Sequence, residues 1–318
     1  MSSLATALLW LAAGAVMMGV FLPERPVVVP EGGGAILVFD ITQSMNVTDV
    51  SLDGEPATRL ALAKRAAQQA LSRMPCGTAL GTGIFAAHRT LVLTAPVEVC
   101  RHRNELKQAI DFIGPSMSWH GNSEVAKAYY AALRIAAADA TRPAIVFLTD
   151  GHEAPPISPL HRPNFVPPPV KTTALIAGFG GDSLARIPKS DPTGRSLGLW
   201  GPDDVMQIDR YKTGRGGSTK GEAFVELDDG TKPDLRVGGT PGSEHLSSLR
   251  EPYLKLLASE TGANYVRVLN PDGLRTAIER TIVMPGWSSL NAQRLCAGIA
   301  LALLAAYFLS QLPGRPSR

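Results

Sequence analysis

Oxygen-bearing side chains follow two apolar segments of this sequence at the points where the segments end. In AILVFDITQSM, Asp40 ends the apolar run, and Thr42 and Ser44 follow at every second position. In PAIVFLTDG, Asp150 ends a second apolar run. Alternate side chains of an extended segment point the same way, so Asp40, Thr42 and Ser44 can face one ion. Carboxylate and hydroxyl oxygens suit hard cations such as Mg²⁺.

The segments that must position these side chains predict an α/β fold. Strands that are apolar throughout, alternating with amphipathic helices, are typical of a parallel sheet covered on both faces. We therefore expect a doubly wound, mainly parallel sheet. The expected strands are residues 35–40, 78–86, 89–97, 143–149, 172–180 and 264–268, and the expected helices are residues 58–74, 104–113, 122–140, 251–262 and 271–282.

Ligands of open α/β sheets bind at the carboxyl ends of the strands. Asp40 and Asp150 are both expected at that edge, and Ser123 begins the Ala-rich helix that follows HGNSEV. Either Asn122 or Ser123 is placed to cap that helix. The expected ion is Mg²⁺, with Ca²⁺ or Mn²⁺ as alternatives. The predicted metal ligands are Asp40, Thr42, Ser44, Ser123 and Asp150.

The segments DITQS, GNS and FLTDG resemble the metal-ion-dependent adhesion site of von Willebrand factor A domains. That family places Asp-x-Ser-x-Ser on a first loop, a Thr on a second and an Asp on a third. Here Thr42 replaces a Ser and Ser123 replaces the Thr, and both keep a hydroxyl. The resemblance covers about residues 35–180 and 246–284, and leaves out residues 181–245.

The resemblance also implies a docking function. In this family the metal keeps an open coordination position, which a carboxylate of a partner protein completes. Trp119 and His120, in SWHGN, are expected on the contact surface, although His120 also fits an ordinary loop histidine. Among membrane-held bacterial members, the chain is similar to those encoded with methanol-oxidation systems. These work beside MoxR-type AAA+ ATPases and are linked to assembly and calcium loading of periplasmic methanol dehydrogenase.

Two other functions stay open at this point. A strand that ends on Asp40, with Thr42 two residues later, also resembles haloacid-dehalogenase phosphatases, in which the first Asp is the nucleophile. A structural membrane scaffold, with a metal that only stabilises the domain, is the other alternative. The sequence contains no Gly-x-Ser-x-Gly motif, no Cys/His zinc spacing and no Gly-Lys-Ser/Thr phosphate loop. We therefore predict a protein that is not an enzyme.

Composition bounds the partners and the compartment. The net charge of +3 over 318 residues is too small to indicate nucleic-acid binding. Cys76 and Cys100 flank a predicted hairpin at matching distances from its turn near His88, so they are expected to form a disulfide at its open end. Two free buried thiols are the alternative. An even pair of cysteines suits an oxidising compartment.

Two uncharged apolar stretches, within residues 1–22 and 294–312, predict membrane-spanning helices. A cleaved signal peptide is the alternative for the first, and a buried helix for the second. Arg315 and Arg318 place the C-terminus in the cytoplasm by the positive-inside rule, and two spans place the N-terminus there too. The expected location is the bacterial inner membrane, with the domain in the periplasm.

The stretch between the two apolar ends divides into a linker and one domain. Pro- and Gly-rich residues 23–34 predict the linker, and residues 35–290 the domain. Residues 181–245, rich in Gly, Pro and charge, interrupt the domain as an insertion on the rim of the sheet, and are either a surface loop or a partner-facing subdomain.

Overall fold

The computed structural model divides the chain into two compact units, which are described separately. One unit contains residues 29–285, and the other contains residues 1–28 and 286–318. The described residues are 3–21, 34–117, 122–157, 163–164, 166–191, 193–205, 223–224, 242–282 and 292–311.

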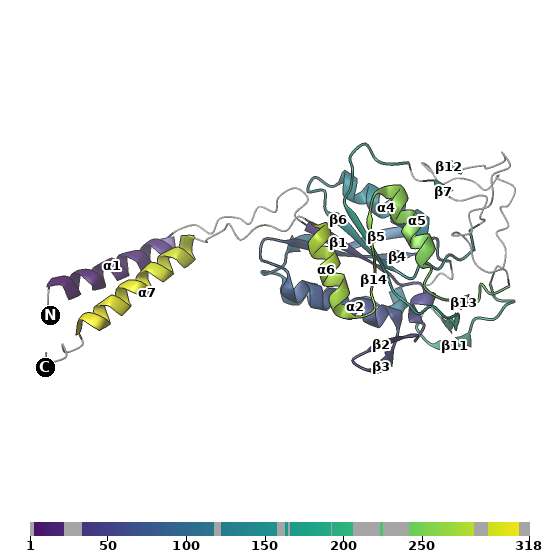
Figure 1. Ribbon diagram of the computed structural model, residues 1–318, viewed down its shortest axis with the longest axis horizontal. Helices are drawn as coiled ribbons and strands as arrows, with labels where there is room; N and C mark the ends of the chain where they lie inside the picture. Colours follow the sequence, from purple (N-terminus) through teal and green to yellow (C-terminus); the bar gives the residue numbers. More distant parts are fainter. Residues whose placement is uncertain are drawn as a thin grey trace. The chain divides into compact units, whose positions relative to one another are not determined.

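A six-stranded sheet forms the centre of the larger unit (Figure 1). The strand order is β14-β8-β6-β1-β4-β5, and every pairing is parallel except that of β4 with the edge strand β5. This confirms the expected α/β fold with a mainly parallel sheet. The strands are β1 (Gly34–Asp40), β4 (Ala79–Ala86), β5 (Arg89–Glu98), β6 (Ala144–Thr149), β8 (Ala174–Gly178) and β14 (Asn264–Arg267).

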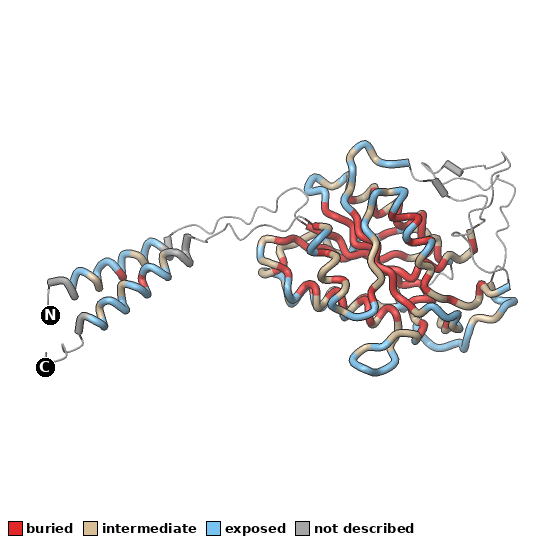
Figure 2. Tube along the Cα trace, in the orientation of Figure 1, coloured by how far each residue is buried: buried red, intermediate tan, exposed pale blue. Residues whose placement is uncertain are grey.

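Helices pack on both faces of this sheet because its central strands are apolar on both sides. Leu37 and Phe39 of β1 share one core with α2, α3 and α6, whereas Ile36 and Val38 share another with α4 and α5. Figure 2 shows the buried strands between these layers. The helices are α2 (Arg59–Arg73), α3 (Arg103–Phe112), α4 (Val125–Ala138), α5 (Glu251–Thr261) and α6 (Pro271–Thr281).

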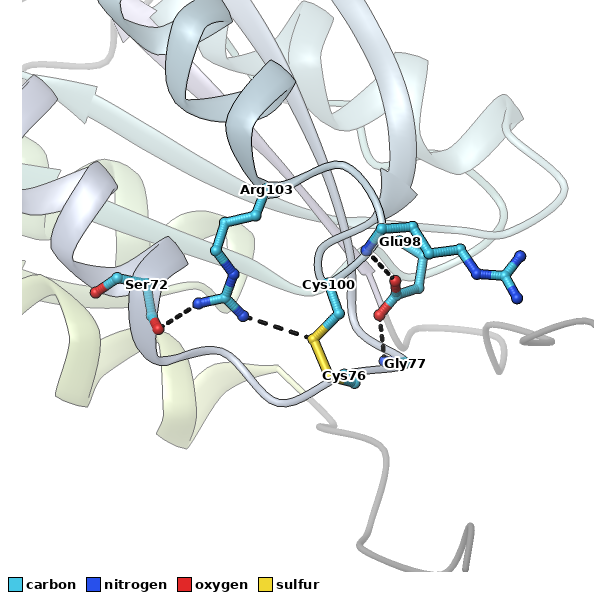
Figure 3. Close-up of a disulfide and its surroundings, with 7 residues drawn as sticks. Ser72, Cys76, Gly77, Glu98, Cys100 and Arg103 are labelled. Atoms are coloured by element: carbon cyan, nitrogen blue, oxygen red, sulfur yellow. Dashed lines mark hydrogen bonds between the residues drawn. A yellow bond between two sulfur atoms is a disulfide. The ribbon is translucent and has the colours of Figure 1, made fainter. Parts of the chain in front are cut away.

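The β4–β5 hairpin is closed at its open end by a disulfide between Cys76 and Cys100 (Figure 3). The Glu98 carboxylate accepts hydrogen bonds from the backbone N–H groups of Gly77 and Arg101, at 2.6 and 2.8 Å. Because Gly34 pairs with Ala79, this end of the hairpin lies beside the amino end of β1. The disulfide is therefore at the opposite edge of the sheet from Asp40.

Short antiparallel ribbons surround the sheet. The first loop contains the 3₁₀ turn η1 (Gln43–Asn46) and a small hairpin, and the described parts of the insertion contribute several strand pairs. A second 3₁₀ turn, η2 (Pro115–Met117), follows α3. The pairs are β2 (Val50–Leu52) with β3 (Glu55–Ala57), β7 (Pro163–Asn164) with β12 (Ala223–Phe224), β9 (Ala185–Arg186) with β13 (Leu246–Ser247), and β10 (Pro188–Ser190) with β11 (Ser196–Leu199).

The smaller unit contains two helices, α1 (Ser3–Phe21) and α7 (Ala292–Gln311), which lie side by side (Figure 1). Within the described residues, no helix is sufficiently long and apolar for a membrane crossing. This finding contradicts the two predicted spans.

Candidate metal centre

Three loops meet at the carboxyl ends of β1 and β6. Backbone hydrogen bonds join Ser123 to Ala154 in both directions, each at 2.7 Å, and Glu124 donates to the carbonyl of Ala87 at 2.6 Å. These bonds hold Ser123 and Glu124, which precede α4, between Ala87, which follows β4, and the loop after β6. The tertiary fold thus brings Ser123 to the edge of the sheet where Asp40 and Asp150 lie.

The Asp40 carboxylate is fully buried and held by neutral donors. Its Oδ1 accepts from the backbone N–H of Thr42 at 2.9 Å and from the Thr42 hydroxyl at 2.6 Å. Its Oδ2 accepts from the hydroxyl of Thr149 at 2.6 Å. The Oγ atoms of Thr42 and Ser44 are 3.2 Å apart. The first loop therefore places the Thr42 hydroxyl on the Asp40 carboxylate and the Ser44 hydroxyl beside that of Thr42. It does so through the turn that enters η1, and not along an extended segment as the every-second spacing predicted.

Ser123 and Asp150 are also buried, but their polar atoms have other partners. The Ser123 hydroxyl donates to the carbonyl of His152 at 2.7 Å. Asp150 accepts from the His152 N–H at 2.9 Å through Oδ1, and from Arg59 Nη1 at 2.5 Å through Oδ2. The hydroxyl of Ser247 adds a longer bond to Asp150 Oδ2, at 3.2 Å.

The charge of Asp150 acts on Asp40. Burial first, and the negative charge of Asp150 second, raise the pKa of Asp40 to about 7, although the hydrogen bonds from Thr149 and Thr42 lower it. A bound cation would reverse this effect, because an opposite charge favours the ionised carboxylate. Asp40 thus has a local environment in which a cation is electrostatically favoured.

The donor set fits a hard divalent ion. The five predicted ligands are all buried and offer only carboxylate and hydroxyl oxygens, which Mg²⁺ and Ca²⁺ prefer. Asp40, Thr42, Ser44, Ser123 and Asp150 are the residues that would hold it. Which ion binds, and whether all five contact it, stays a prediction.

Arg59 was not identified from the sequence, yet it is the only fully buried Arg or Lys among the described residues. It is the first residue of α2, where the helix dipole disfavours a positive charge. Two aspartates compensate: Nε and Nη2 donate to Asp49 at 2.9 and 2.6 Å, and Nη1 donates to Asp150. A basic residue opening a helix was the signal that could have found it.

Asp49 and Ser247 complete the surroundings of Arg59. Burial alone would raise the pKa of Asp49, but the hydrogen bonds and charge of Arg59 lower it below its usual value. Ser247 accepts from Arg59 through its hydroxyl at 2.7 Å and its carbonyl at 3.1 Å. These contacts join the first loop, the loop after β6 and the strand β13 before α5, which the sequence pattern could not indicate.

Two further side chains of these loops, His152 and Gln43, have different surroundings. His152 is buried, and burial lowers its pKa to about 4, so its imidazole is neutral at pH 7. Its Nδ1 has no hydrogen-bond partner among the described residues. Gln43, between Thr42 and Ser44, instead faces the insertion: its Oε1 accepts from the indole N–H of Trp200 at 2.7 Å. The insertion therefore touches the predicted metal loop.

The predicted cap of α4 is wrong. Neither Asn122 nor Ser123 is the N-cap, which is Glu124 and makes no side-chain capping bond. The carboxylate of Glu153 supplies this bond from the loop after β6, accepting from the N–H of Ala126 at 2.9 Å. The Ser123 hydroxyl instead donates to the carbonyl of His152.

Trp119 and His120, the predicted partner contacts, lie outside the described residues. Cys76, Glu98 and Cys100 place three potential metal ligands close together. Both sulfurs are joined in the disulfide, so this cluster lacks the thiolates that a metal would need.

The region that carries these loops matches one known domain. Residues 35–152 match the von Willebrand factor type A domain. The match begins with β1 and ends two residues after Asp150, so it includes all three loops of the candidate centre. No curated protein matches the chain.

Solved structures resemble the chain only distantly. An aerotolerance-related membrane protein from Bacteroides fragilis is 18% identical, with a TM-score of 0.46, and the match covers 78% of this chain and 97% of that one. The protein BatB from Bacteroides thetaiotaomicron is 15% identical, with a TM-score of 0.43, and the match covers 86% and 98%. Similarity at this level carries no argument about function.

Proposed function

We propose that this protein binds a divalent cation at the carboxyl ends of the strands of its larger unit and uses it to dock a partner protein. The observation that carries the proposal is the Asp40 carboxylate, which is fully buried, close to Asp150 and held only by neutral donors. A cation bound there offsets an electrostatic cost that the metal-free fold carries. The match of residues 35–152 to a type A domain supports the same proposal.

The partner would supply a carboxylate. Only two of the five predicted ligands are charged, and Arg59 already pairs with one of them. The other three predicted ligands are neutral hydroxyls, so an external carboxylate would be a stronger ligand for a divalent ion than any of them. We therefore propose docking, and not catalysis, as the function of this centre. The resemblance to methanol-oxidation proteins makes a MoxR-type AAA+ ATPase and a periplasmic dehydrogenase the first partners to test, in assembly or metal insertion.

We further propose that the smaller unit attaches the chain to a bacterial inner membrane, with the larger unit on the periplasmic side. The α1–α7 pair exposes large apolar side chains, including Trp10, Leu301 and Phe308, each at least two thirds exposed. Lipid is a suitable environment for such a surface. The disulfide between Cys76 and Cys100 supports the oxidising side. Membrane fractionation, followed by thiol labelling with and without reductant, tests both points.

Calorimetric titration of the full-length chain with Mg²⁺ tests the metal site. We expect saturable binding to the wild type and none to Asp40→Ala. Asp272→Asn, which removes a negative charge at an exposed position, is the matched control and should bind as the wild type does. Equal binding by all three proteins would show that Asp40 holds no metal.

Mn²⁺ tests the open coordination position. Water-proton relaxation should detect exchangeable water on the protein-bound Mn²⁺, and added acetate should displace that water. The phosphatase alternative is tested in the same samples with p-nitrophenyl phosphate. Hydrolysis by the wild type that is lost in Asp40→Ala would establish Asp40 as a nucleophile and overturn the docking function.

A further inference from the structure

Arg59 adds a permanent positive charge to the candidate centre. Its guanidinium is fully buried and is shared between Asp49, which is 14% exposed, and Asp150, which is fully buried. A buried charge is tolerated only when it is paired and hydrogen-bonded, and Arg59 meets both conditions through five hydrogen bonds.

The backbone around Arg59 leaves little room for the guanidinium to move. Gly180 has a φ of +136°, and a Cβ added there would lie 2.9 Å from Nε of Arg59. The neighbouring Gly181 donates its N–H to Asp49 at 2.9 Å. The loop after β8 therefore packs directly against the guanidinium and orients its carboxylate partner. Arg59 is a fixed part of the centre.

The charges of this cluster can be counted. Three carboxylates, those of Asp40, Asp49 and Asp150, face one guanidinium, so two negative charges remain when all are ionised. The charge of Arg250 acts on His152 and on Glu244, and among the described residues Arg250 forms no ion pair with these three carboxylates. One divalent cation would neutralise the cluster, whereas a trivalent cation would leave an excess positive charge in a buried site.

We propose that Arg59 is a resident cation that sets the charge of the centre, and that it thereby fits the centre to a divalent rather than a trivalent metal ion. This inference rests on the proposed metal-binding function and adds its charge selectivity. Arg59 acts through Asp150 and makes no contact with the metal, so it is a positioning and charge-setting residue. Asp49 acts on the metal indirectly, by sharing the guanidinium.

The test compares Mg²⁺ and Tb³⁺ binding to the full-length chain by calorimetry and Tb³⁺ luminescence. Asp49→Asn keeps the side-chain shape and removes one negative charge from the cluster. We expect Mg²⁺ affinity to fall about tenfold and Tb³⁺ affinity to fall further, because Coulomb energy grows with ion charge. Arg59→Gln should act in the opposite direction, with the larger gain for Tb³⁺. Arg59→Lys, which keeps the charge, should retain the preference of the wild type.

Asp272→Asn is again the matched control. Asp272 contacts Arg73 at the end of α2 remote from Arg59, about 20 Å away along the helix. Unchanged affinity of Asp49→Asn for both ions would overturn the inference, as would equal losses for both ions, which indicate a structural role. These results decide the question even if Arg59→Gln does not fold. Wild-type protein that binds neither ion would instead overturn the proposed function.

Discussion

The candidate centre has two halves that treat a buried carboxylate differently. In the hydroxyl half, Asp40 is surrounded by neutral donors, and in the guanidinium half, Asp150 is paired with a buried cation. The difference teaches that, among the described residues, only the hydroxyl half buries a carboxylate with no cationic partner, because the guanidinium half contains its own positive charge. The hydroxyl half is Asp40, Thr42, Ser44 and Thr149, and the guanidinium half is Asp150, Arg59, Asp49 and Ser247.

The largest expected effect is a difference in the free energy of unfolding between variants of the two carboxylates. In EDTA, Asp150→Asn should lower the free energy of unfolding by roughly 3 kcal/mol, because it leaves a buried guanidinium with one charged partner. Asp40→Asn should cost little or be stabilising, since it removes a buried charge that Asp150 repels. Urea denaturation of both variants checks this. Equal losses would mean that the halves do not differ in charge compensation.

The disulfide lies at the other end of the sheet, so its removal tests whether general destabilisation affects metal binding at the centre. Cys76 and Cys100 are 24 residues apart, and losing a crosslink of this loop size costs about 3 kcal/mol in the chain-entropy model. The double variant Cys76→Ser/Cys100→Ser should therefore be less stable. Its Mg²⁺ affinity should be unchanged, because the disulfide lies at the opposite edge of the sheet. A large loss of affinity would show that general destabilisation, and not charge, controls the centre.

Glu153 extends the comparison to a carboxylate outside the predicted ligand set. Burial raises its pKa to about 8, while neutral donors, the Tyr253 hydroxyl and the Ala126 N–H, hold it. In the folded state Glu153 therefore stays protonated up to about pH 8, whereas in the unfolded state it loses its proton near pH 4.5. Stability should therefore fall as the pH rises from about 4.5 to 8.

Glu153→Gln should remove this contribution to the pH dependence. By pH 8 the variant should be more stable than the wild type by roughly 2 kcal/mol, less than the full pKa shift implies because relaxation and water entry reduce the cost. Thermal denaturation in EDTA from pH 5 to pH 8 measures the difference. Parallel curves of stability against pH for the two proteins would show that neutral donors are sufficient to keep a buried carboxylate ionised here.

The smallest expected effect concerns the contact between the hydroxyl half and the insertion. Gln43→Ala removes the hydrogen bond from Trp200 and should cost about 1 kcal/mol. Hydrogen exchange should increase in β10 and β11, which this contact fastens to the first loop. Mg²⁺ affinity should stay the same because the Gln43 side chain bonds to Trp200 and Ser190 of the insertion and is not a predicted ligand. Changed affinity with unchanged exchange would contradict this assignment.

The sequence predicted the two halves unequally. The hydroxyls of Thr42 and Ser44 follow Asp40 within one loop, so local spacing was sufficient to group them. Arg59 pairs with Asp150, 91 residues later, and no local pattern reports such a contact. The same reason explains the wrong cap of α4, since Glu153 reaches the helix from another loop.

The sequence by itself determined the order of strands and helices along the chain and the mainly parallel sheet. It also placed the predicted oxygen ligands at the carboxyl ends of the strands. These follow from apolar periodicity and from residues at strand ends, which are local properties. Only the tertiary structure decided how the buried charges are compensated. Compensation depends on distances between loops that are remote in sequence. In this protein the fold places the Arg59 guanidinium beside Asp150 and leaves Asp40 with neutral donors.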